Sequence, residues 1–359
     1  MRYLVYGTGA VGGLVGGRLA LAGSPVTFLV RPYALPALRR DGLRLTGGSH
    51  PGHLTAPRLT DDLHTLVERS ERPDLVILAV KAWACEQAAR SLHAAWDDPP
   101  PVLCLLNGIG NEATLARHLG PVRVLPAALT TAVLMPEPGL VRVERERGLD
   151  LYSGHPLAPR LAAEFTQAGS RVRQHRDADR MKWSKLITNI VANASSAILG
   201  WTPGQVFSHP GVYRLELEAL RECVRVMAAQ GLRPEGLVGV PVRLLAWSLR
   251  LPARLSQPLL RRSVASGRGS KRPSLRADIG RGRSEVDWLN GAIVRFGKQL
   301  HVPTPANDVL FETMAELVHG RQTQALWQDR PESLLARAQE AGVPGIQGYN
   351  PRTSPGSPG

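Results

Sequence analysis

The residues best suited to chemistry lie near the middle of the chain, where a lysine and two asparagines recur every four residues. They are Lys185, Asn189 and Asn193, and their neighbours are mostly apolar. On one continuous helix this spacing puts the three side chains on a common face, and the apolar neighbours predict that the helix is largely buried. Buried polar groups need partners. A bound substrate with carbonyl, carboxylate or hydroxyl groups could be that partner, and so could other protein groups or water.

Lys185 suits the role of a proton donor. Partial removal from water lowers the pKa of a lysine, which makes its ammonium a better acid near neutral pH. Hydride transfer to a ketone leaves an alkoxide that needs a proton, and Lys185 could supply it. We therefore expect Lys185 to be the catalytic residue of a ketone reduction.

A glycine motif at the amino terminus indicates where a hydride donor would bind. It follows a buried strand at 2–6 and opens a helix at 10–22, and it consists of Gly7, Thr8, Gly9, Ala10, Val11 and Gly12. The first glycine permits a tight turn, the second lets the backbone approach a pyrophosphate, and the third lets helix and strand pack closely. The amino terminus of the helix then faces the phosphates. Since a second strand follows at 25–30, we predict a Rossmann dinucleotide site.

The residue that ends the second strand distinguishes NADPH from NADH. Enzymes that use NADH carry an acid there for the ribose 2′-hydroxyl, whereas an arginine accommodates a 2′-phosphate. Here the residue is Arg31, and no acid appears before Asp41. A solvated arginine at a strand end is the other interpretation. We predict NADPH, with Arg31 paired to its 2′-phosphate.

Two further polar residues follow predicted strands, and ligands bind at the carboxyl edge of a parallel sheet. Lys81 ends the strand at 74–80 and Asn107 follows the strand at 102–106. Lys81 is expected to contact the cofactor, although a surface lysine is nearly as good an interpretation. The Asn107 amide could bridge cofactor and substrate, although Asn-Gly is also a common turn dipeptide.

Glu285 is the remaining candidate, and the residues alone leave its role open. Ser284 could cap a helix over 284–301 and leave Glu285 in its first turn, where the helix dipole stabilises an acid. That structural role and a role at the active site are equally compatible with the sequence.

The elements that must position these residues fall into two parts, as a length of 359 residues suggests. Strands and helices alternate to about residue 175, which predicts a parallel sheet covered on both faces. Long helical patterns follow at 180–199, 211–230 and 284–301. We therefore expect an α/β protein with a Rossmann NADP-binding domain over 1–176, an all-helical substrate domain over 177–341 and a disordered tail over 342–359.

The net charge of +14 comes mainly from one segment. Residues 237–284 hold eleven Arg and Lys but only one acid. Neither aromatic interleaving nor a known nucleic-acid module accompanies them, so we expect no nucleic-acid partner. The segment accounts for +10 of the net charge of +14, so the rest of the chain carries only about +4, an ordinary charge for an enzyme.

We interpret residues 237–272 as a basic helical insertion. Apolar residues recur at helical spacing over 241–251 and, in a shorter stretch interrupted by Pro258, over 255–262. We expect its leucines and Trp247 to pack the insertion onto the second domain as a lid, with a mobile loop at 267–270. The positive charge of this segment is expected to attract an anionic substrate and NADPH. Contact with an anionic membrane surface is the alternative.

The sequence also bears on location. The glycines in the uncharged amino-terminal run argue against a secretory signal, and no later segment has the composition of a membrane span. Cys85, Cys104 and Cys223 fit no disulfide or metal spacing. We expect a cytoplasmic enzyme without a metal.

Taken together, the motifs resemble the ketopantoate reductase (2-dehydropantoate 2-reductase) family over about residues 1–320. The matching pieces run in family order: Gly7–Gly12, Arg31, Val80-Lys81, Asn107-Gly108-x-Gly110, Lys185-x3-Asn189-x3-Asn193, Pro273-Ser274-Leu275 and Ser284-Glu285-Val286-Asp287-x2-Asn290-Gly291. The resemblance implies a Rossmann domain joined to an all-helical domain, with the active site in the cleft between them. It also implies reduction of 2-dehydropantoate by NADPH to (R)-pantoate, in pantothenate and coenzyme A biosynthesis.

The resemblance further implies a role for each matching residue. Lys185 would be the proton donor, and Asn189, Asn193 and Ser274 would hold the substrate. Asn107 would touch both ligands. Glu285 would bind near the nicotinamide and the substrate hydroxyl.

The second half departs from the family pattern. The spacing from Lys185 to Glu285 is longer by an added helical hairpin, and segment 278–284 is one residue short. These departures concern the substrate more than the reaction. The alternatives are NADPH-dependent reduction of another small 2-oxo acid or ketone, and a non-catalytic NADP-binding sensor. A homodimer is one possible assembly.

Overall fold

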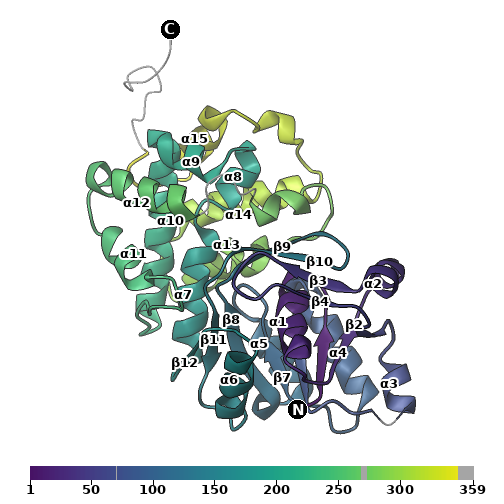
Figure 1. Cartoon of the computed structure of the whole chain (residues 1–359). Coiled ribbons are helices and arrows are strands. Elements are labelled where there is room, and N and C mark those ends of the chain that lie inside the picture. Colours follow the sequence, from purple (N-terminus) through teal and green to yellow (C-terminus); the bar gives the residue numbers. More distant parts are fainter. Residues whose placement is uncertain (70, 268–272, 347–359) are drawn as a thin grey trace. The chain divides into compact units, whose positions relative to one another are not determined.

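The apolar runs of the first half form the strands of one eight-stranded sheet (Figure 1). The computed structural model, which describes residues 1–69, 71–267 and 273–346, orders them β12-β11-β8-β7-β6-β1-β2-β5. Strands β8 to β5 of this order run parallel, β11 is antiparallel to β8, and β12 is parallel to β11. Their bounds are β1 (Tyr3–Tyr6), β2 (Val26–Leu29), β5 (Arg58–Thr60), β6 (Leu75–Leu78), β7 (Val102–Cys104), β8 (Val124–Leu129), β11 (Leu149–Tyr152) and β12 (Val172–His175).

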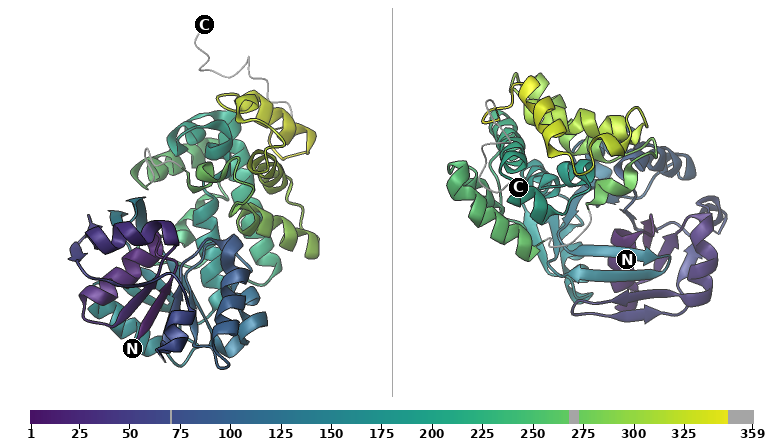
Figure 2. Two further views of the ribbon diagram at one scale, coloured as in Figure 1. Left: turned by 90° about the vertical axis from the view of Figure 1, so that its right-hand side faces the viewer. Right: turned by 90° about the horizontal axis from the view of Figure 1, so that it is seen from above.

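Both faces of this sheet are buried, which explains why its central strands are apolar throughout. Tyr3 and Val5 of β1 pack on one side with α1 (Ala10–Leu21) and α6 (Ala158–Gln167). Leu4 packs on the other side with α4 (Cys85–Ala95) and α5 (Asn111–Leu119). The left view of Figure 2 shows helices on both sides of the sheet. The predicted doubly covered parallel sheet is confirmed for β8 to β5, whereas β11, which pairs antiparallel with β8, departs from it.

A second, four-stranded sheet packs against α1 in the order β4-β3-β10-β9. Its strands are β3 (Leu43–Thr46), β4 (Gly52–Leu54), β9 (Ala132–Glu137) and β10 (Leu140–Arg145). Short helices complete this half: α2 (Leu35–Asp41), α3 (His64–Glu68), and the 3-10 turns η1 (Pro32–Ala34), η2 (Ala82–Ala84) and η3 (Pro121–Arg123).

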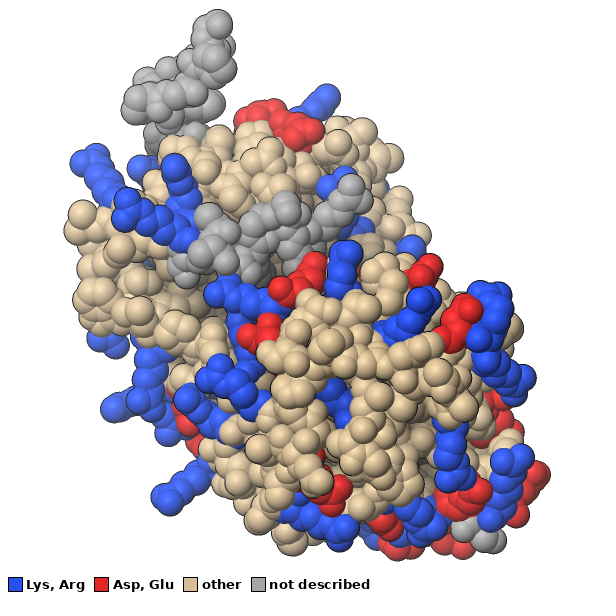
Figure 3. Space-filling view, viewed as in Figure 1, with Lys and Arg blue, Asp and Glu red and all other residues tan. Residues whose placement is uncertain are grey.

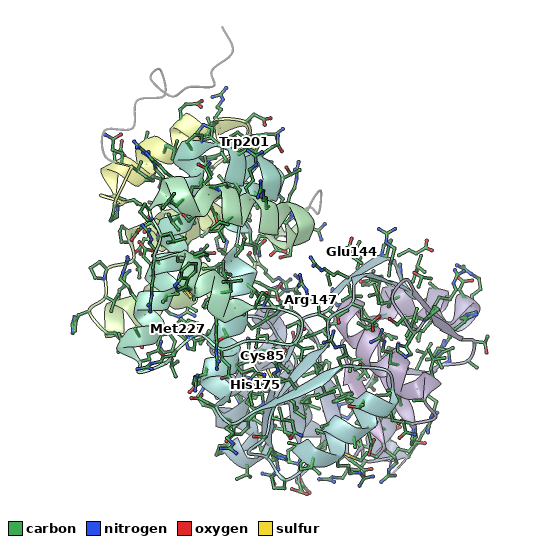
Figure 4. The ribbon with its side chains drawn as sticks, turned by 60° about the vertical axis from the view of Figure 1, so that its left-hand side comes forward. Cys85, Glu144, Arg147, His175, Trp201 and Met227 are labelled. Atoms are coloured by element: carbon green, nitrogen blue, oxygen red, sulfur yellow. The ribbon has the colours of Figure 1, made fainter. Side chains whose placement is uncertain are left out.

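The chain divides into two compact units, and the first unit consists of two separate segments of the chain. The first unit is Met1–Lys185 with Gly236–Val240, and the second holds Leu186–Glu235 and the described residues from Pro241 onward. Buried polar contacts attach the returning segment to the first unit. Asp150 accepts bonds from the backbone N–H of Val238 at 3.1 and 3.2 Å and lies 2.7 Å from Nε2 of His175. Figure 4 labels His175. The domain limits expected from the sequence remain predictions.

The second unit is helical, as predicted. Its elements are α8 (Ala194–Leu199), α9 (Pro203–Ser208), α10 (Pro210–Ala229), α11 (Val242–Ser248), α12 (Ala253–Gly267), η4 (Ser274–Asp278), η5 (Val286–Trp288), α13 (Asn290–Gln299), α14 (Pro305–Val318), η6 (Gln324–Leu326) and α15 (Pro331–Glu340). Helix α7 (Ala178–Ile190) runs through the division between the units.

Three helix predictions were wrong in detail. The pattern at 180–199 is two helices, α7 and α8, and the pattern at 284–301 becomes a full helix only at Asn290. Pro258 lies inside α12, which is longer than α11 rather than shorter. Of the mobile loop expected at 267–270, residues 268–270 lie outside the described residues, as do residues 347–359 of the expected tail.

Candidate active site

The glycine turn has the backbone that a dinucleotide site requires. Gly7 has a φ of 103°, and a side chain there would meet the carbonyl of Ala79 at 2.9 Å. A Cβ on Gly12 would come within 2.1 Å of the Gly7 oxygen, so only glycine lets α1 pack this closely. The hydroxyl of Thr8 donates to the carbonyl of Leu29 at 3.1 Å and ties the turn to the end of β2.

The same turn leaves room for a phosphate group. Gly9 is the exposed residue that precedes α1, and a Cβ there would meet nothing within 4 Å. No side chain caps α1, and its first turn, which includes Ala10 and Val11, contains no acid. The unpaired N–H groups of a helix start attract anions. These residues therefore fit the pyrophosphate of a dinucleotide.

The structure brings four of the expected site residues to one edge of the sheet. Gly7, Arg31, Lys81 and Asn107 follow β1, β2, β6 and β7, which are neighbours in the order β7-β6-β1-β2. The chain passes from β1 to its neighbour β2 on one side, and after β5 and α3 it enters β6 on the other side of β1. Such a switch point at the carboxyl edge is where open α/β sheets bind ligands.

Arg31 is exposed at this edge, where extended backbone leads into η1. Within residues 1–69, 71–267 and 273–346 it has no ion-pair partner. An unpaired guanidinium matches a phosphate well because it can donate two parallel hydrogen bonds. Lys81, which precedes η2, is half-buried and has partners within the protein.

The Asn107 loop is held by a lysine that sequence reasoning missed. Lys182 of α7 is buried, and its ammonium donates to the carbonyls of Leu106 at 2.7 Å and Ala127 at 3.2 Å. It also forms an ion pair with Glu112 at 2.7 Å, in the first turn of α5. Burial by itself would lower the pKa of Lys182, but the Glu112 carboxylate offsets this effect and the net shift is upward. Lys182 is therefore a charged structural anchor for the loop.

The loop itself is shaped by its own glycines and amides. Gly108 and Gly110 have φ values of 86° and 104°, and the side-chain amide of Asn111 donates to the carbonyl of Asn107 at 3.0 Å. This bond fixes the loop through the backbone of Asn107. The Asn107 side chain is half-buried.

Lys185 lies about one turn after Lys182 on α7 and is half-buried. It is the last residue of the first unit in this part of the chain, and Asn189 follows in the second. Both have contacts within the protein. The expected lowering of the Lys185 pKa remains a prediction.

Asn193 does not continue the face of α7, which corrects the three-residue stripe expected from the sequence. Helix α7 ends at Ile190, and Ala192 has a φ of 46°. The cause is the buried carboxylate of Glu216 on α10, which accepts the N–H of Ala192 at 2.8 Å and the Ser195 hydroxyl at 2.5 Å. A backbone N–H that donates to a carboxylate no longer donates to the carbonyl four residues earlier, so the helix is interrupted there.

The break turns Asn193 toward another predicted substrate residue. Its side-chain amide donates to the Ser274 hydroxyl at 3.2 Å and to the carbonyl of Asn189 at 3.1 Å. Ser274 begins η4 and is exposed. The structure thus brings Asn189, Asn193 and Ser274 together within the second unit.

Glu285 is buried and lies outside a regular helix. It precedes the short turn η5, so it does not occupy the first turn of a long helix, as the structural alternative required. Asp278, also buried, accepts the Ser284 hydroxyl at 2.9 Å and the Glu285 N–H at 3.3 Å, and Ser284 in turn accepts the N–H of Val286. The Asp278 carboxylate therefore links the two ends of segment 278–284 by hydrogen bonds, and the sequence had not identified this role of Asp278.

No group of three or more His, Cys, Asp or Glu among the described residues is arranged to hold a metal ion. Over the same residues, no helix is long and apolar enough to cross a membrane.

The doubly wound sheet with a glycine turn at its switch point, followed by a helical unit, defines a two-domain dinucleotide-dependent oxidoreductase. Residues 3–153 match the family model "Ketopantoate reductase PanE/ApbA", and residues 177–318 match its C-terminal counterpart. The chain belongs to the ketopantoate reductase family, so the predicted family is confirmed.

Individual relatives agree with this assignment. The 2-dehydropantoate 2-reductase of Halobacterium salinarum is 30% identical over 326 residues, which cover 89% of this chain and 98% of that protein. The crystal structure of a PanE/ApbA family ketopantoate reductase from Ralstonia eutropha JMP134 is 30% identical with a TM-score of 0.75, over 90% of this chain and 100% of that one. A ternary structure of D-mandelate dehydrogenase with NADH and anilino(oxo)acetate has a TM-score of 0.70 over 96% of this chain and 100% of that one. At 20% identity this last likeness shows the fold alone.

Proposed function

We propose that the protein reduces 2-dehydropantoate to (R)-pantoate with NADPH, a step in pantothenate and coenzyme A biosynthesis. One observation carries the proposal. In a member of the ketopantoate reductase family, Gly7, Arg31, Lys81 and Asn107 follow four neighbouring parallel strands at the ligand-binding edge of the sheet. Its relative from Halobacterium salinarum, which aligns over nearly its whole length, is a 2-dehydropantoate 2-reductase.

The glycine turn and Arg31 would hold the cofactor, which supplies a hydride to the substrate carbonyl carbon when bound. The N–H groups at the start of α1 would hold the pyrophosphate, and the exposed Arg31 would pair with the 2′-phosphate. Lys81 and Asn107 line the same edge of the sheet. The Asn107 amide is assigned to both cofactor and substrate.

Lys185 would complete the reaction. Its Nζ transfers a proton to the carbonyl oxygen, which becomes the product hydroxyl, and the lysine is left neutral until solvent reprotonates it. Asn189, Asn193 and Ser274, which lie together in the second unit, orient the substrate. We assign buried Glu285 to the nicotinamide and the substrate hydroxyl.

The decisive experiment is NADPH oxidation by the purified protein against a panel of 2-oxo acids that includes ketopantoate. We expect ketopantoate to have the highest kcat/KM. A higher value for another member of the panel would assign the protein to the alternative, reduction of a different small 2-oxo acid. NADPH binding without turnover of any of them would favour the non-catalytic sensor.

Assembly and location complete the proposal. We place the enzyme in the cytoplasm, since all three cysteines, Cys85, Cys104 and Cys223, are buried free thiols. A homodimer is proposed for testing by light scattering of the purified chain. The small-molecule substrate is the partner that family membership supports.

A further inference from the structure

The two helices of the basic insertion expose large apolar side chains to solvent. Leu244 and Trp247 of α11 are 61% and 54% exposed, and Leu255 and Leu259 of α12 are 59% and 51% exposed. These four are among nine such residues in the described chain, yet they lie within sixteen positions. The expectation that the leucines and Trp247 pack the insertion onto the protein was therefore wrong for these four. Concentrated exposed apolar surface indicates an interaction site.

This exposure does not come from a loosely attached segment. Val242, Leu249 and Leu260 of the same helices are buried. Arg221 of α10 donates to the carbonyls of Leu249 at 2.8 Å and Leu251 at 2.9 Å, which satisfies the end of α11.

Polar contacts hold α12 in the same way. The Ser256 hydroxyl, which is fully buried, bonds to the Tyr213 hydroxyl, and the Gln257 amide donates to the carbonyl of Phe207 at 3.1 Å. Both helices are thus docked by their buried faces, and among the described residues the four large apolar side chains remain more than half exposed.

The same segment also carries arginines without acidic partners. Arg243, Arg250, Arg254, Arg261 and Arg262 are exposed, and none of them pairs with an acid among the described residues. No Asp or Glu occurs between Glu235 and Asp278. On the left-hand flank of Figure 3, where Figure 1 places α11 and α12, uncharged surface is bordered by blue side chains. We call this set of four apolar residues and five arginines the hairpin surface.

The charge of the hairpin surface excludes a second copy of this chain as a good partner. A two-fold interface joins the same patch on both subunits and must be self-complementary. The hairpin surface holds cations and no acid, so two copies would bring like charges together. A partner that matches the hairpin surface must therefore offer both negative charge and an apolar region.

We propose that the hairpin surface binds an anionic lipid membrane peripherally. Leucines enter the boundary between headgroups and acyl chains, a tryptophan favours that same boundary, and arginines extend to the lipid phosphates. Short helices with exposed Leu, Trp and Arg side chains have this composition. Binding requires no spanning helix, in agreement with the absence of one among the described residues.

The test is co-sedimentation of the full chain with vesicles of phosphatidylcholine alone or mixed with phosphatidylserine. We expect binding to the mixed vesicles only, weakened by salt. The double variant Trp247→Ser/Leu255→Ser should lose most of the binding, and each of Arg254→Glu and Arg261→Glu should weaken it at least fivefold, about the effect of losing one basic residue near such a surface. All these positions are exposed, so an unchanged Tm verifies the fold.

Matched controls come from the same unit. Leu326 is 51% exposed, as Leu259 is, and Arg321 is exposed. Leu326→Ser and Arg321→Glu should bind vesicles as the wild type does. Absence of binding to the mixed vesicles, or equal losses in these controls, would overturn the proposal.

Two other outcomes would assign the hairpin surface elsewhere. Self-association that the Trp247→Ser/Leu255→Ser variant abolishes would make it an interface between copies of the chain. Strong salt dependence of kcat/KM without vesicle binding would favour the lid expected from the sequence, and a flat salt response with vesicle binding would exclude it.

Discussion

The ammonium of Lys182 and the carboxylate of Glu112 lie 2.7 Å apart and join α7 to the first turn of α5. The loop that carries Asn107 directly precedes α5, and its neighbour Leu106 accepts a hydrogen bond from the same ammonium. A helix that bears the proposed proton donor is thereby fixed to a loop that bears a proposed ligand contact, within one compact unit.

Loss of this anchor should destabilise the first unit. Removing one partner of a buried ion pair costs about 3–5 kcal/mol, and Lys182→Met should fall at the lower end because Glu112 is 21% exposed. Urea unfolding measures the change. The matched control is Lys298→Met. Lys298 is 74% exposed and its ammonium lies as far as 4.0 Å from the Asp308 carboxylate, so this variant should change stability by less than about 0.5 kcal/mol. Equal stabilities for the two variants would refute the anchoring role.

Arg31 should select the cofactor. We expect Arg31→Ala to weaken NADPH binding by about 1.5–3 kcal/mol, roughly ten- to a hundredfold, and to leave NADH binding nearly unchanged, because only NADPH has the 2′-phosphate. Titration of both cofactors by fluorescence measures this. Arg39→Ala, an exposed arginine on α2, is the control. A wild type that binds both cofactors equally would contradict the assignment.

Lys185 should act on turnover and not on cofactor binding. Lys185→Ala is expected to bind NADPH normally and to lower kcat by about 10²–10⁴-fold, the usual effect of losing a general acid. Asn189→Ala should instead raise KM for the oxo acid, since its amide is proposed to hold the ground state as well as the transition state. Near-normal turnover by Lys185→Ala would require another proton donor.

Glu222 should make stability depend on pH. Burial raises the pKa of Glu222 to about 7, although the N–H groups of Ala306 and Asn307 oppose the shift. From its ordinary value of 4.5 to about 7, the folded state holds a proton that the unfolded chain releases, so stability falls as pH rises through this window and then stays low. The fall is on the order of 3 kcal/mol.

The measurement is urea unfolding at about pH 5 and about pH 8. Glu222→Gln should remove most of the difference between the two values, because the amide does not titrate. Glu312→Gln, at a carboxyl that is 59% exposed, should keep it. A variant Glu222→Gln with the wild-type difference would show that other groups cause it.

The sequence by itself determined the central strands of the first unit and the chemistry at their edge. Strand and helix periods are local properties, so the runs around Tyr3, Val76 and Leu103 predicted their strands within two residues. The glycine turn could also be predicted from the sequence, because a positive φ at Gly7 and close packing at Gly12 exclude residues with a side chain. Order along the chain then implied that Arg31, Lys81 and Asn107 share one edge of the sheet.

Tertiary structure alone decided what depends on distant residues. The break after α7 comes from Glu216, 24 positions from the Ala192 N–H that it accepts, and Lys182 is satisfied by Leu106 and Glu112, far earlier in the chain. Amphipathic spacing likewise could not reveal that Trp247 faces solvent, because a helical period shows that a face is apolar but not whether anything covers it. Partners far apart in sequence become neighbours only once the fold has formed.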